Sequence, residues 1–381
     1  MLDGRSDVLV IGAGPAGCAA GIVLARAGVD VCVVDRASFP RDKTCGDALS
    51  NKGVALIREL GAGARLDAGP HALVRRAAAV FPGNLRVARD YAEPGWIVPR
   101  LSLDDSLRDA LEASGARLHQ GVQVRALELG ERDRVDRIVG DDLRWRAPIV
   151  IAADGPSSVA WPALDLSKPK GRALAMASTA YYEGIAYPDG PELADHYFEH
   201  DLPAGYGWVF PAVEGLANVG VYQRDDAYRR CNHRLPAVLE QFVARHGERF
   251  ANARRVGPVR SWPLPIANRG PFAARGVLLV GDAGGFVDPL SGEGIWQALF
   301  TGMAAGKVAI EAALRGHLDA ALADRYARTC SEAIARPSRM KAHVQDAMTR
   351  FVALGLHRSR LLRGILQWGY AHGALEQTKV V

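Results

Sequence analysis

The chain has 381 residues, of which 49% are hydrophobic and 23% charged, and its formal net charge is +5. This balance is typical of a globular protein with a buried core, and no apolar run is long enough to span a bilayer. The arginines form no basic patch interleaved with aromatic residues, so we expect no nucleic acid partner. The five cysteines are odd in number and lack a C-x-x-C spacing, so we predict neither a disulfide framework nor a metal site.

The first predicted element is a strand that runs directly into a glycine-rich turn. Residues 8–17 read VLVIGAGPAG, and a second apolar strand over 31–35 ends in an aspartate. The first glycine of such a unit permits the tight turn, the second lets backbone amides approach a pyrophosphate, and the third lets the helix pack on the sheet. The acid suits a ribose diol, as in NAD or FAD. We expect a dinucleotide site at Gly12, Gly14, Pro15, Ala16, Gly17, Asp35 and Arg36.

The middle of the chain alternates between helix and strand patterns. Residues 71–100 are expected to form short strands with turns, and the chain is mostly helical from Gly294 onward. The other predicted helices cover 52–60, 103–114 and 235–246, and the other predicted strands cover 123–129, 135–139, 143–145, 172–183, 196–200, 207–211, 217–223 and 260–264.

Two further strand-to-loop junctions carry small and acidic residues. Residues 149–158 read IVIAADGPSS, and residues 276–294 read GVLLVGDAGGFVDPLSGEG. A nicotinamide enzyme does not need the second junction, whereas the ribityl chain and ring of a flavin extend past the pyrophosphate. We expect Asp282 to bind ribityl hydroxyls or to cap the next helix, whose dipole would stabilise the reduced flavin. Asp154-Gly155, taken alone, also fits an ordinary turn.

The order of these three motifs resembles the group of FAD enzymes that includes para-hydroxybenzoate hydroxylase, over residues 8 to about 310. The pattern predicts an α/β fold in which a Rossmann-type FAD-binding domain is interleaved with a mainly antiparallel β-sheet substrate domain. The FAD-binding domain is expected to comprise 1–70, 101–165 and 266–325, the substrate domain 71–100 and 166–265, and a C-terminal helical region 326–381.

Three stretches narrow the resemblance. Residues 39–50 contain Lys43-Thr-Cys45-Gly46-Asp47, residues 205–211 contain Tyr-x-Trp-x-Phe-Pro, and residues 288–294 read DPLSGEG. Together they are similar to the geranylgeranyl reductase family, which uses reduced FAD to saturate isoprenoid double bonds. The resemblance implies that Arg100 contacts the cofactor. With it, we expect these residues at the cofactor as well: Cys45, Gly46, Asp47, Val124, Asp154, Gly155, Gly281, Asp282, Pro289, Gly292, Glu293, Gly294 and Ile295.

The substrate side is expected to be aromatic. Tyr206, Trp208 and Phe210 alternate along a strand, so they point to one face and can hold an apolar chain or ring; ordinary core packing is the alternative. Cys45 and Tyr206 are our candidates for the proton donor, although Cys45 also suits a tight loop as a small residue. Arg41 and Lys43 are expected either to contact phosphate or to be plain surface charges. Asp288 and Glu293 are expected to act either as an acid or as a cap of their loop.

These features predict an FAD-dependent oxidoreductase that reduces carbon–carbon double bonds of an apolar, isoprenoid-like substrate. NAD(P)H or a protein donor would supply the electrons, because no second GxGxxG unit is present. A monooxygenase that uses a flavin hydroperoxide is the alternative, and the absence of Trp-x-Trp-x-Ile-Pro argues against a halogenase. A flavoprotein that holds a lipid without turnover is the third reading.

The stretch 351–368 is amphipathic and basic. It fits either a membrane-surface helix or the mouth of a lipid tunnel, or a helix packed on its own domain. Because the chain enters its first strand within a few residues, no secretory signal is predicted. We expect a cytoplasmic protein, with peripheral membrane contact as the alternative.

Overall fold

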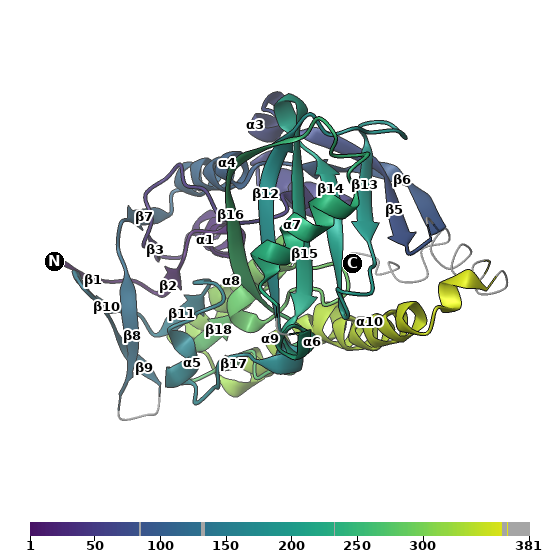
Figure 1. Ribbon diagram of the computed structural model, residues 1–381. Helices are drawn as coiled ribbons and strands as arrows, with labels where there is room; N and C mark the ends of the chain where they lie inside the picture. The colour runs from purple at the N-terminus through teal and green to yellow at the C-terminus, as the bar shows by residue number, and fades with distance from the viewer. Residues whose placement is uncertain (84, 131–133, 232, 360–363, 365–381) are drawn as a thin grey trace.

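A mostly parallel sheet forms one half of the molecule (Figure 1). The computed structural model describes residues 1–83, 85–130, 134–231, 233–359 and 364. The strand order is β17-β18-β11-β2-β3-β7. The central strands are continuous apolar runs that are buried throughout, as expected of parallel strands covered on both faces. Their bounds are β2 (Val8–Ile11), β3 (Val31–Asp35), β7 (Arg117–Gln120), β11 (Ile149–Ala152) and β18 (Val277–Leu279), with β17 (Ala273–Ala274) antiparallel at the edge.

Two different layers cover this sheet. Helices α1 (Pro15–Arg26), α4 (Arg100–Ala113) and α8 (Ile295–Arg315) pack against one face. The second layer is a four-stranded sheet in the order β1-β10-β9-β8, packed with α5 (Ala160–Ala163). The strands of that layer are β1 (Leu2–Arg5), β10 (Leu143–Arg146), β9 (Val135–Gly140) and β8 (Val124–Leu129).

Helices α1 and α8 approach each other through glycine. A Cβ atom at Gly302 would lie 2.1 Å from the carbonyl oxygen of Ala16, and one at Gly306 would lie 3.1 Å from that of Ala20. Gly302 leaves no room for a side chain, and Gly306 is in tight contact. The start of α1, which carries the glycine-rich turn, is therefore fixed against α8.

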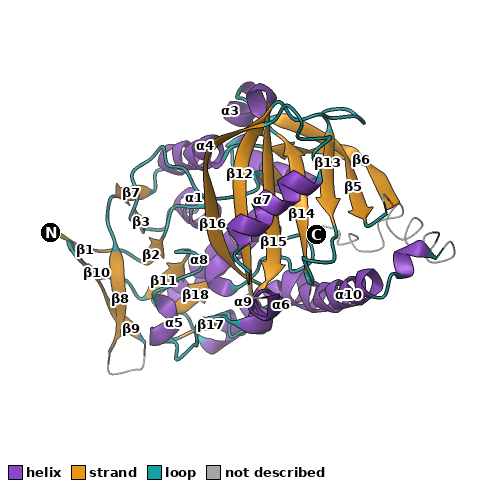
Figure 2. Ribbon diagram, in the orientation of Figure 1, coloured by secondary structure: helices purple, strands orange, loops and turns teal. Residues whose placement is uncertain are grey.

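An eight-stranded sheet forms the other half, in the order β16-β12-β15-β14-β13-β5-β6-β4. All neighbours are antiparallel except β13 and β5. Helix α7 (Leu235–Arg245) covers its outer face in Figure 2. The strands are β16 (Arg254–Pro265), β12 (Leu174–Glu183), β15 (Leu216–Arg224), β14 (Gly205–Pro211), β13 (Leu193–Tyr197), β5 (Ala72–Phe81), β6 (Leu85–Ile97) and β4 (Ala48–Leu49).

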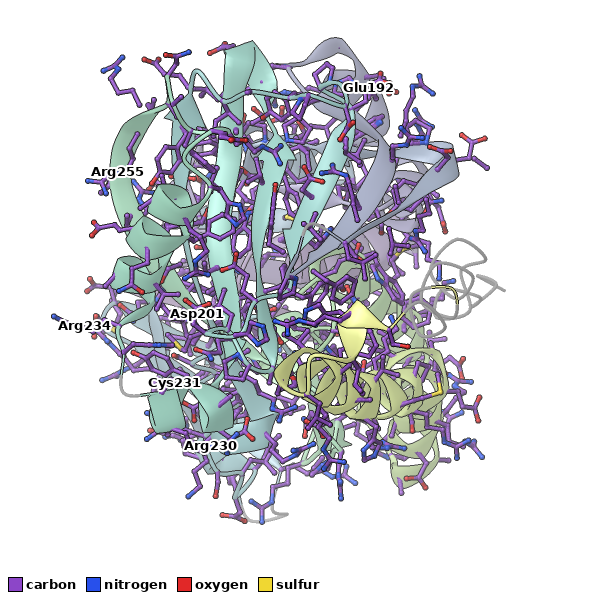
Figure 3. All side chains as sticks on the ribbon, turned by 45° about the vertical axis from the view of Figure 1, so that its right-hand side comes forward. Glu192, Asp201, Arg230, Cys231, Arg234 and Arg255 are labelled. Carbon is purple, nitrogen blue, oxygen red and sulfur yellow. The ribbon has the colours of Figure 1, made fainter. Side chains whose placement is uncertain are left out.

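The remaining helices complete the molecule. Helix α10 (Arg336–Ala353) lies across the ends of the large sheet's strands, and the view in Figure 3 brings it forward. The exposed side chains labelled there, Glu192 and Arg255 among them, project from the periphery. None of the helices in the described ranges is long and apolar enough to cross a membrane. The other helices are α2 (Asn51–Glu59), α3 (Gly63–Ala68), α6 (Asp225–Cys231) and α9 (Ala320–Cys330), with a π-helical turn at Ser331–Ala335.

Most predicted elements are present, but some bounds differ; the strand predicted over 260–264, for example, is β16 and begins at Arg254. Most of residues 71–100 form one long hairpin, because β5 and β6, joined through a turn that begins at Pro82, pair along most of their length. The strand expected over 196–200 starts earlier, at Leu193, since Leu193 and Ala194 are buried and pair with β5. Of the stretch 351–368, residues 360–363 and 365–368 lie outside the described residues.

Candidate active site

The glycine-rich turn, residues 12–17, is called the cradle below. Gly12 has φ +99°, and a Cβ there would lie 2.5 Å from the Ala153 carbonyl oxygen. A Cβ at Gly17 would lie 1.8 Å from the Gly12 carbonyl oxygen, so both positions require glycine. At Gly14, the N-cap of α1, the only atom within 4 Å of such a Cβ is Nη2 of Arg41, at 3.6 Å. An uncapped helix N-terminus beside an arginine suits a pyrophosphate.

Asp35 is tied to this turn. Its carboxylate accepts hydrogen bonds from the backbone of Ala13 (2.7 Å) and Ala37 (2.8 Å), and the side chain is buried. Arg36 beside it is exposed. Asp35 therefore stabilises the turn, and its place beside the turn fits the ribose contact that the sequence predicts.

The predicted cofactor residues Asp154-Gly155 and Val124 lie in different surroundings. The Asp154 Oδ2 accepts from the Val159 amide at 2.7 Å, and its Oδ1 is buried without a hydrogen-bond partner among the described residues. The Cα of Asp154 lies 3.2 Å from the Cβ position of Gly12, so this junction packs directly on the cradle. Val124 is buried in the apolar layer behind the sheet and does not line the cavity described next.

A cavity of about 610 Å³ runs from Pro15 at the start of α1 to the inner face of the large sheet. It joins residues that are up to 333 positions apart, from Pro15 to Met348. Its walls are mainly apolar side chains of the large sheet and α10, and polar groups lie both near the starts of α1 and α8 and on strands of the large sheet. The predicted residues that line it are Pro15, Cys45, Gly46, Arg100, Tyr206, Trp208, Phe210, Asp282, Gly292, Glu293, Gly294 and Ile295.

The cysteine loop, residues 43–47, forms one wall. Arg100 is buried, binds Asp104 through two hydrogen bonds of 2.8 and 2.7 Å, and also reaches the Cys45 thiol. Burial raises the pKa of Cys45, and the Arg100 charge opposes that rise without cancelling it. Burial also pushes up the pKa of Asp104, but Arg100 and Arg41 outweigh burial and hold that pKa below its ordinary value.

Arg41 and Lys43 are both engaged with carboxylates. The Arg41 guanidinium lies 2.9 Å from Asp104, and the Lys43 ammonium lies 3.5 Å from Asp282. Helix α8 begins after Gly294 without a side-chain cap, so Asp282 does not cap it. Asp282 instead faces the cavity, with Lys43 beside it.

Behind the cysteine loop lies a buried polar network centred on Asn218. The Asn218 side chain donates to the Cys45 carbonyl and to Asp47 Oδ2, each at 2.9 Å, and accepts from Thr179 (2.7 Å) and Trp208 Nε1 (3.0 Å). This amide therefore uses its full hydrogen-bonding capacity.

Asp47 is the ionisable member of that network. It is buried at φ +61° and accepts a further hydrogen bond from the Tyr181 hydroxyl. Burial raises the pKa of Asp47 to about 6, against the opposing effect of the hydrogen bonds from Tyr181 and Asn218. The network couples the cysteine loop to strands β12 and β15.

The aromatic wall, Tyr206, Trp208 and Phe210, faces the cysteine loop. A Cβ at Gly46 would lie 3.6 Å from both Trp208 and Phe210, so these rings pack on the loop backbone. The Trp208 and Phe210 rings are stacked with centroids 6.0 Å apart. All three rings are buried in the protein and line the cavity, so they serve both as core and as cavity wall.

Residues 288–294, which we call the cofactor loop, are held by side chains of β14, β15 and α10. Asp288 Oδ1 accepts from the Leu290 and Ser291 amides, at 2.9 and 3.0 Å, so this carboxylate caps the loop. The Lys341 ammonium of α10 lies 2.5 Å from Asp288 Oδ2. Two backbone carbonyls of the loop accept further hydrogen bonds. Tyr206 donates to the Ser291 carbonyl, and Tyr222 (2.9 Å) and Gln345 (2.7 Å) donate to the Pro289 carbonyl.

Several residues of the site were not predicted. Asn218 could have been found as an amide within the apolar strand 216–221, where an unpaired polar group would be costly. Tyr222 lies four residues after Asn218 in the same strand. Because side chains alternate along a strand, both point to one face, and Tyr222 could have been found in this way. Tyr181, His196, Lys341 and Gln345 carry no local signal, because their roles depend on contacts with distant segments.

Comparisons with known proteins agree with this geometry. The family model described as "FAD binding domain" matches residues 5–339. A menaquinone reductase of Mycobacterium tuberculosis is 34% identical over 87% of this chain and 83% of its own length. A digeranylgeranylglycerophospholipid reductase of Methanothermobacter thermautotrophicus is 30% identical over 86% of this chain and 83% of its own.

Solved structures show the same fold. A geranylgeranyl bacteriochlorophyll reductase-like protein from Thermoplasma acidophilum superimposes with a TM-score of 0.79 at 21% identity, covering 98% of each chain. A flavin-dependent brominase has the same TM-score at 20% identity, covering 96% of this chain and 92% of its own. The fold and the site define an FAD-dependent oxidoreductase with the fold of para-hydroxybenzoate hydroxylase. The chain belongs to the geranylgeranyl reductase family.

Proposed function

We propose that this protein reduces carbon–carbon double bonds of an isoprenoid or similarly apolar substrate at the expense of reduced FAD. The observation that carries the proposal is the cavity, which reaches from Pro15 at the start of α1 to the aromatic wall. An apolar chain placed there would lie among buried rings and excluded from water. The names of the menaquinone and digeranylgeranylglycerophospholipid reductases fit a substrate of this kind.

The residues present fit FAD. Gly14 and Arg41 would hold the pyrophosphate and Asp35 the ribose, while the orphaned Oδ1 of Asp154 lies in reach of the same cradle. Asp282 and the backbone of the cofactor loop would hold the ribityl chain and ring. Reduced FAD supplies a hydride when bound. The reductant that renews it, in our proposal, is NAD(P)H or a protein donor.

Cys45 is our candidate for the proton donor. An isolated alkene needs a proton at one carbon as it receives hydride at the other, and burial keeps the Cys45 thiol protonated by raising its pKa. Arg100 and the Asp47 amide are placed to stabilise the thiolate that remains. Tyr206, the second candidate, donates its hydroxyl hydrogen to the Ser291 carbonyl, and burial raises its pKa well above the ordinary value.

The test is an anaerobic single turnover. The FAD-loaded protein is photoreduced and mixed with a menaquinone or a geranylgeranyl lipid, and flavin reoxidation and product mass are followed. We expect substrate-dependent reoxidation and a gain of two hydrogens. Reoxidation no faster than the blank would refute the reduction, and a gain of one oxygen in air would indicate a monooxygenase instead.

The role of Cys45 is tested in the same assay. Cys45→Ala should slow the substrate-dependent step by about 10²- to 10⁴-fold, the usual contribution of a positioned acid, while FAD content stays unchanged. Cys231→Ala, at a half-buried cysteine outside the cavity wall, is the matched control. Equal rates for both variants would remove Cys45 from the mechanism.

The cytoplasmic location, with peripheral membrane contact as the alternative, stays a prediction.

A further inference from the structure

Helix α10 has one face inside the protein and one face in solvent. Its inner side lines the large cavity through Lys341, Val344 and Met348. Met348 also lines a second cavity, of about 240 Å³, which is walled by α10 and by residues between 198 and 206. Helix α10 therefore borders both cavities, and in Figure 1 it lies along the lower edge of the molecule.

The outward face of α10 carries cations and no carboxylate. Its exposed residues recur every three or four positions, as expected for one face of a helix. They are Arg336, Met340, His343, Ala347, Arg350 and, in the last turn, Ala353. Neither arginine has an ion pair with another described residue. The one acid of the helix, Asp346, lies on its flank and pairs with Arg172 and Arg224.

Large apolar side chains are exposed on the same part of the molecule. Met340 is 54% exposed, and Leu354 and Leu356, just past the end of the helix, are 71% and 38% exposed. Within the described ranges, no other helix or strand carries more than one exposed side chain of this kind. Exposed apolar side chains that gather in one place indicate a contact surface.

The neighbouring helix α9 has an ordinary solvent face. It exposes Asp324 beside Arg325, and Arg325 pairs with Glu311. The outward face of α10 differs, because its cations lack acids and stand beside Met340 and Leu354. A layer of anionic headgroups above hydrocarbon is complementary to such a face in both respects. An acidic protein would match the charges, but it would not account for the apolar side chains among them.

We propose that the outward face of α10, from Arg336 to Leu354, docks on an anionic lipid bilayer. The arginines would lie among the headgroups, with Met340 and Leu354 at the edge of the hydrocarbon. The inference rests on the proposed function, because a lipid substrate has to leave a bilayer to be reduced. It places the contact mainly before the stretch 351–368 that the sequence singles out. A lipid at this face is separated from the cavity wall at Met348 by one helix diameter, about 10 Å.

The experiment measures how the oxidised, FAD-loaded protein sediments with vesicles, so it does not depend on turnover. The vesicles are phosphatidylcholine alone, or phosphatidylcholine with about one third phosphatidylglycerol. We expect binding to the anionic vesicles only, and less of it at about 1 M salt than at about 0.1 M, because salt screens the charges. Arg336→Gln combined with Arg350→Gln should weaken this binding by about 30-fold, which is about fivefold for each arginine.

The matched control is Arg144→Gln combined with Arg146→Gln. Both residues are exposed on β10, which lies on the opposite side of the molecule from α10 in Figure 1. This variant has the same net charge as the α10 variant and should bind anionic vesicles like the wild type. Met340→Ser combined with Leu354→Ser tests the apolar part and should weaken binding by about 10-fold at either salt concentration.

The three variants should keep the wild-type FAD content and reduce a detergent-dispersed substrate at the wild-type rate, since none of the altered residues lines either cavity. Equal binding of the two arginine variants, or a wild type that does not prefer anionic vesicles, would overturn the docking surface. So would a wild type that ignores vesicles but self-associates through this face. Docking without any product that gains two hydrogens would refute the proposed function alone.

Discussion

At the residue scale, Asp47 shows the free-energy cost of ionising a buried carboxyl group. Its pKa rises from 3.8 to about 6 because of burial, which corresponds to about 3 kcal/mol. The folded state therefore binds this proton more tightly than the unfolded state. The stabilisation is present below pH 4 and is lost as the pH rises through 6.

Asp47→Asn should remove this pH dependence. Asparagine tolerates the left-handed conformation at φ +61°, and its amide oxygen can accept the hydrogen bonds from Tyr181 and Asn218. Relative to the variant, the wild type should lose about 3 kcal/mol of unfolding free energy between pH 3.5 and 7. Urea unfolding across that range measures it. The exposed Asp136→Asn should track the wild type, and a pH-independent difference for Asp47→Asn would contradict the assignment.

Asn218→Ala should be among the most destabilising single changes. It removes an amide that satisfies four groups, of which the Asp47 carboxylate, the Trp208 Nε1 and the Thr179 hydroxyl are buried. We expect a loss of about 3 kcal/mol or more in unfolding free energy, since each orphaned buried group costs about 1–3 kcal/mol. The exposed Asn252→Ala is the control and should change stability by less than about 0.5 kcal/mol. Similar values for the two variants would show that the network contributes little.

At the element scale, α10 completes the cofactor loop from a distance. Lys341 neutralises Asp288, whose carboxylate is nearly fully buried. Lys341→Met leaves that charge without its cation, and we expect a loss of about 2–4 kcal/mol in stability together with weaker FAD retention. Lys307→Met, on the exposed face of α8, should have neither effect. In a double-mutant cycle Asp288→Asn should recover part of the loss, and purely additive effects would argue against the pair.

The contact between α1 and α8 gives a second prediction at this scale. Gly302→Ala would place a Cβ 2.1 Å from the Ala16 carbonyl and force the helices apart. We expect a loss of about 1–3 kcal/mol and weaker FAD binding, because the cradle begins on α1. Gly247→Ala adds the same methyl group 3.5 Å from its nearest neighbour and should be tolerated. Unchanged FAD affinity in Gly302→Ala, measured by flavin fluorescence, would contradict this coupling.

The elements also show what the sequence could predict. The glycine-rich turn and the Tyr-x-Trp-x-Phe-Pro strand have local signals, since glycine fits the close approaches and alternation places three rings on one face. Strands with turns are predicted over 71–100, but the length of β5 and β6 is not, because polar residues interrupt the apolar alternation along both strands. Lys341 and Gln345 could not be predicted, because their partners lie more than 50 residues away.

At the scale of the whole molecule, one cavity lies between the large sheet and the starts of α1 and α8, and the cofactor is expected to stabilise both sides. FAD at 100 times its Kd should raise the unfolding free energy by about 2.7 kcal/mol. Hydrogen exchange should slow in the cysteine loop and the cofactor loop together. ADP, which carries only the nucleotide half, is the control and should protect the cradle alone. Protection confined to the cradle with FAD would place the flavin ring outside the cavity.

The span of the cavity wall, from Pro15 to Met348, bears on how the protein is made. During translation, the rings of β14 leave the ribosome well before α10 does. Until α10 emerges, the nascent chain leaves the side of this aromatic wall that α10 borders exposed to solvent. We therefore expect truncation before Lys341 to yield aggregation and chaperone capture rather than a yellow, smaller enzyme.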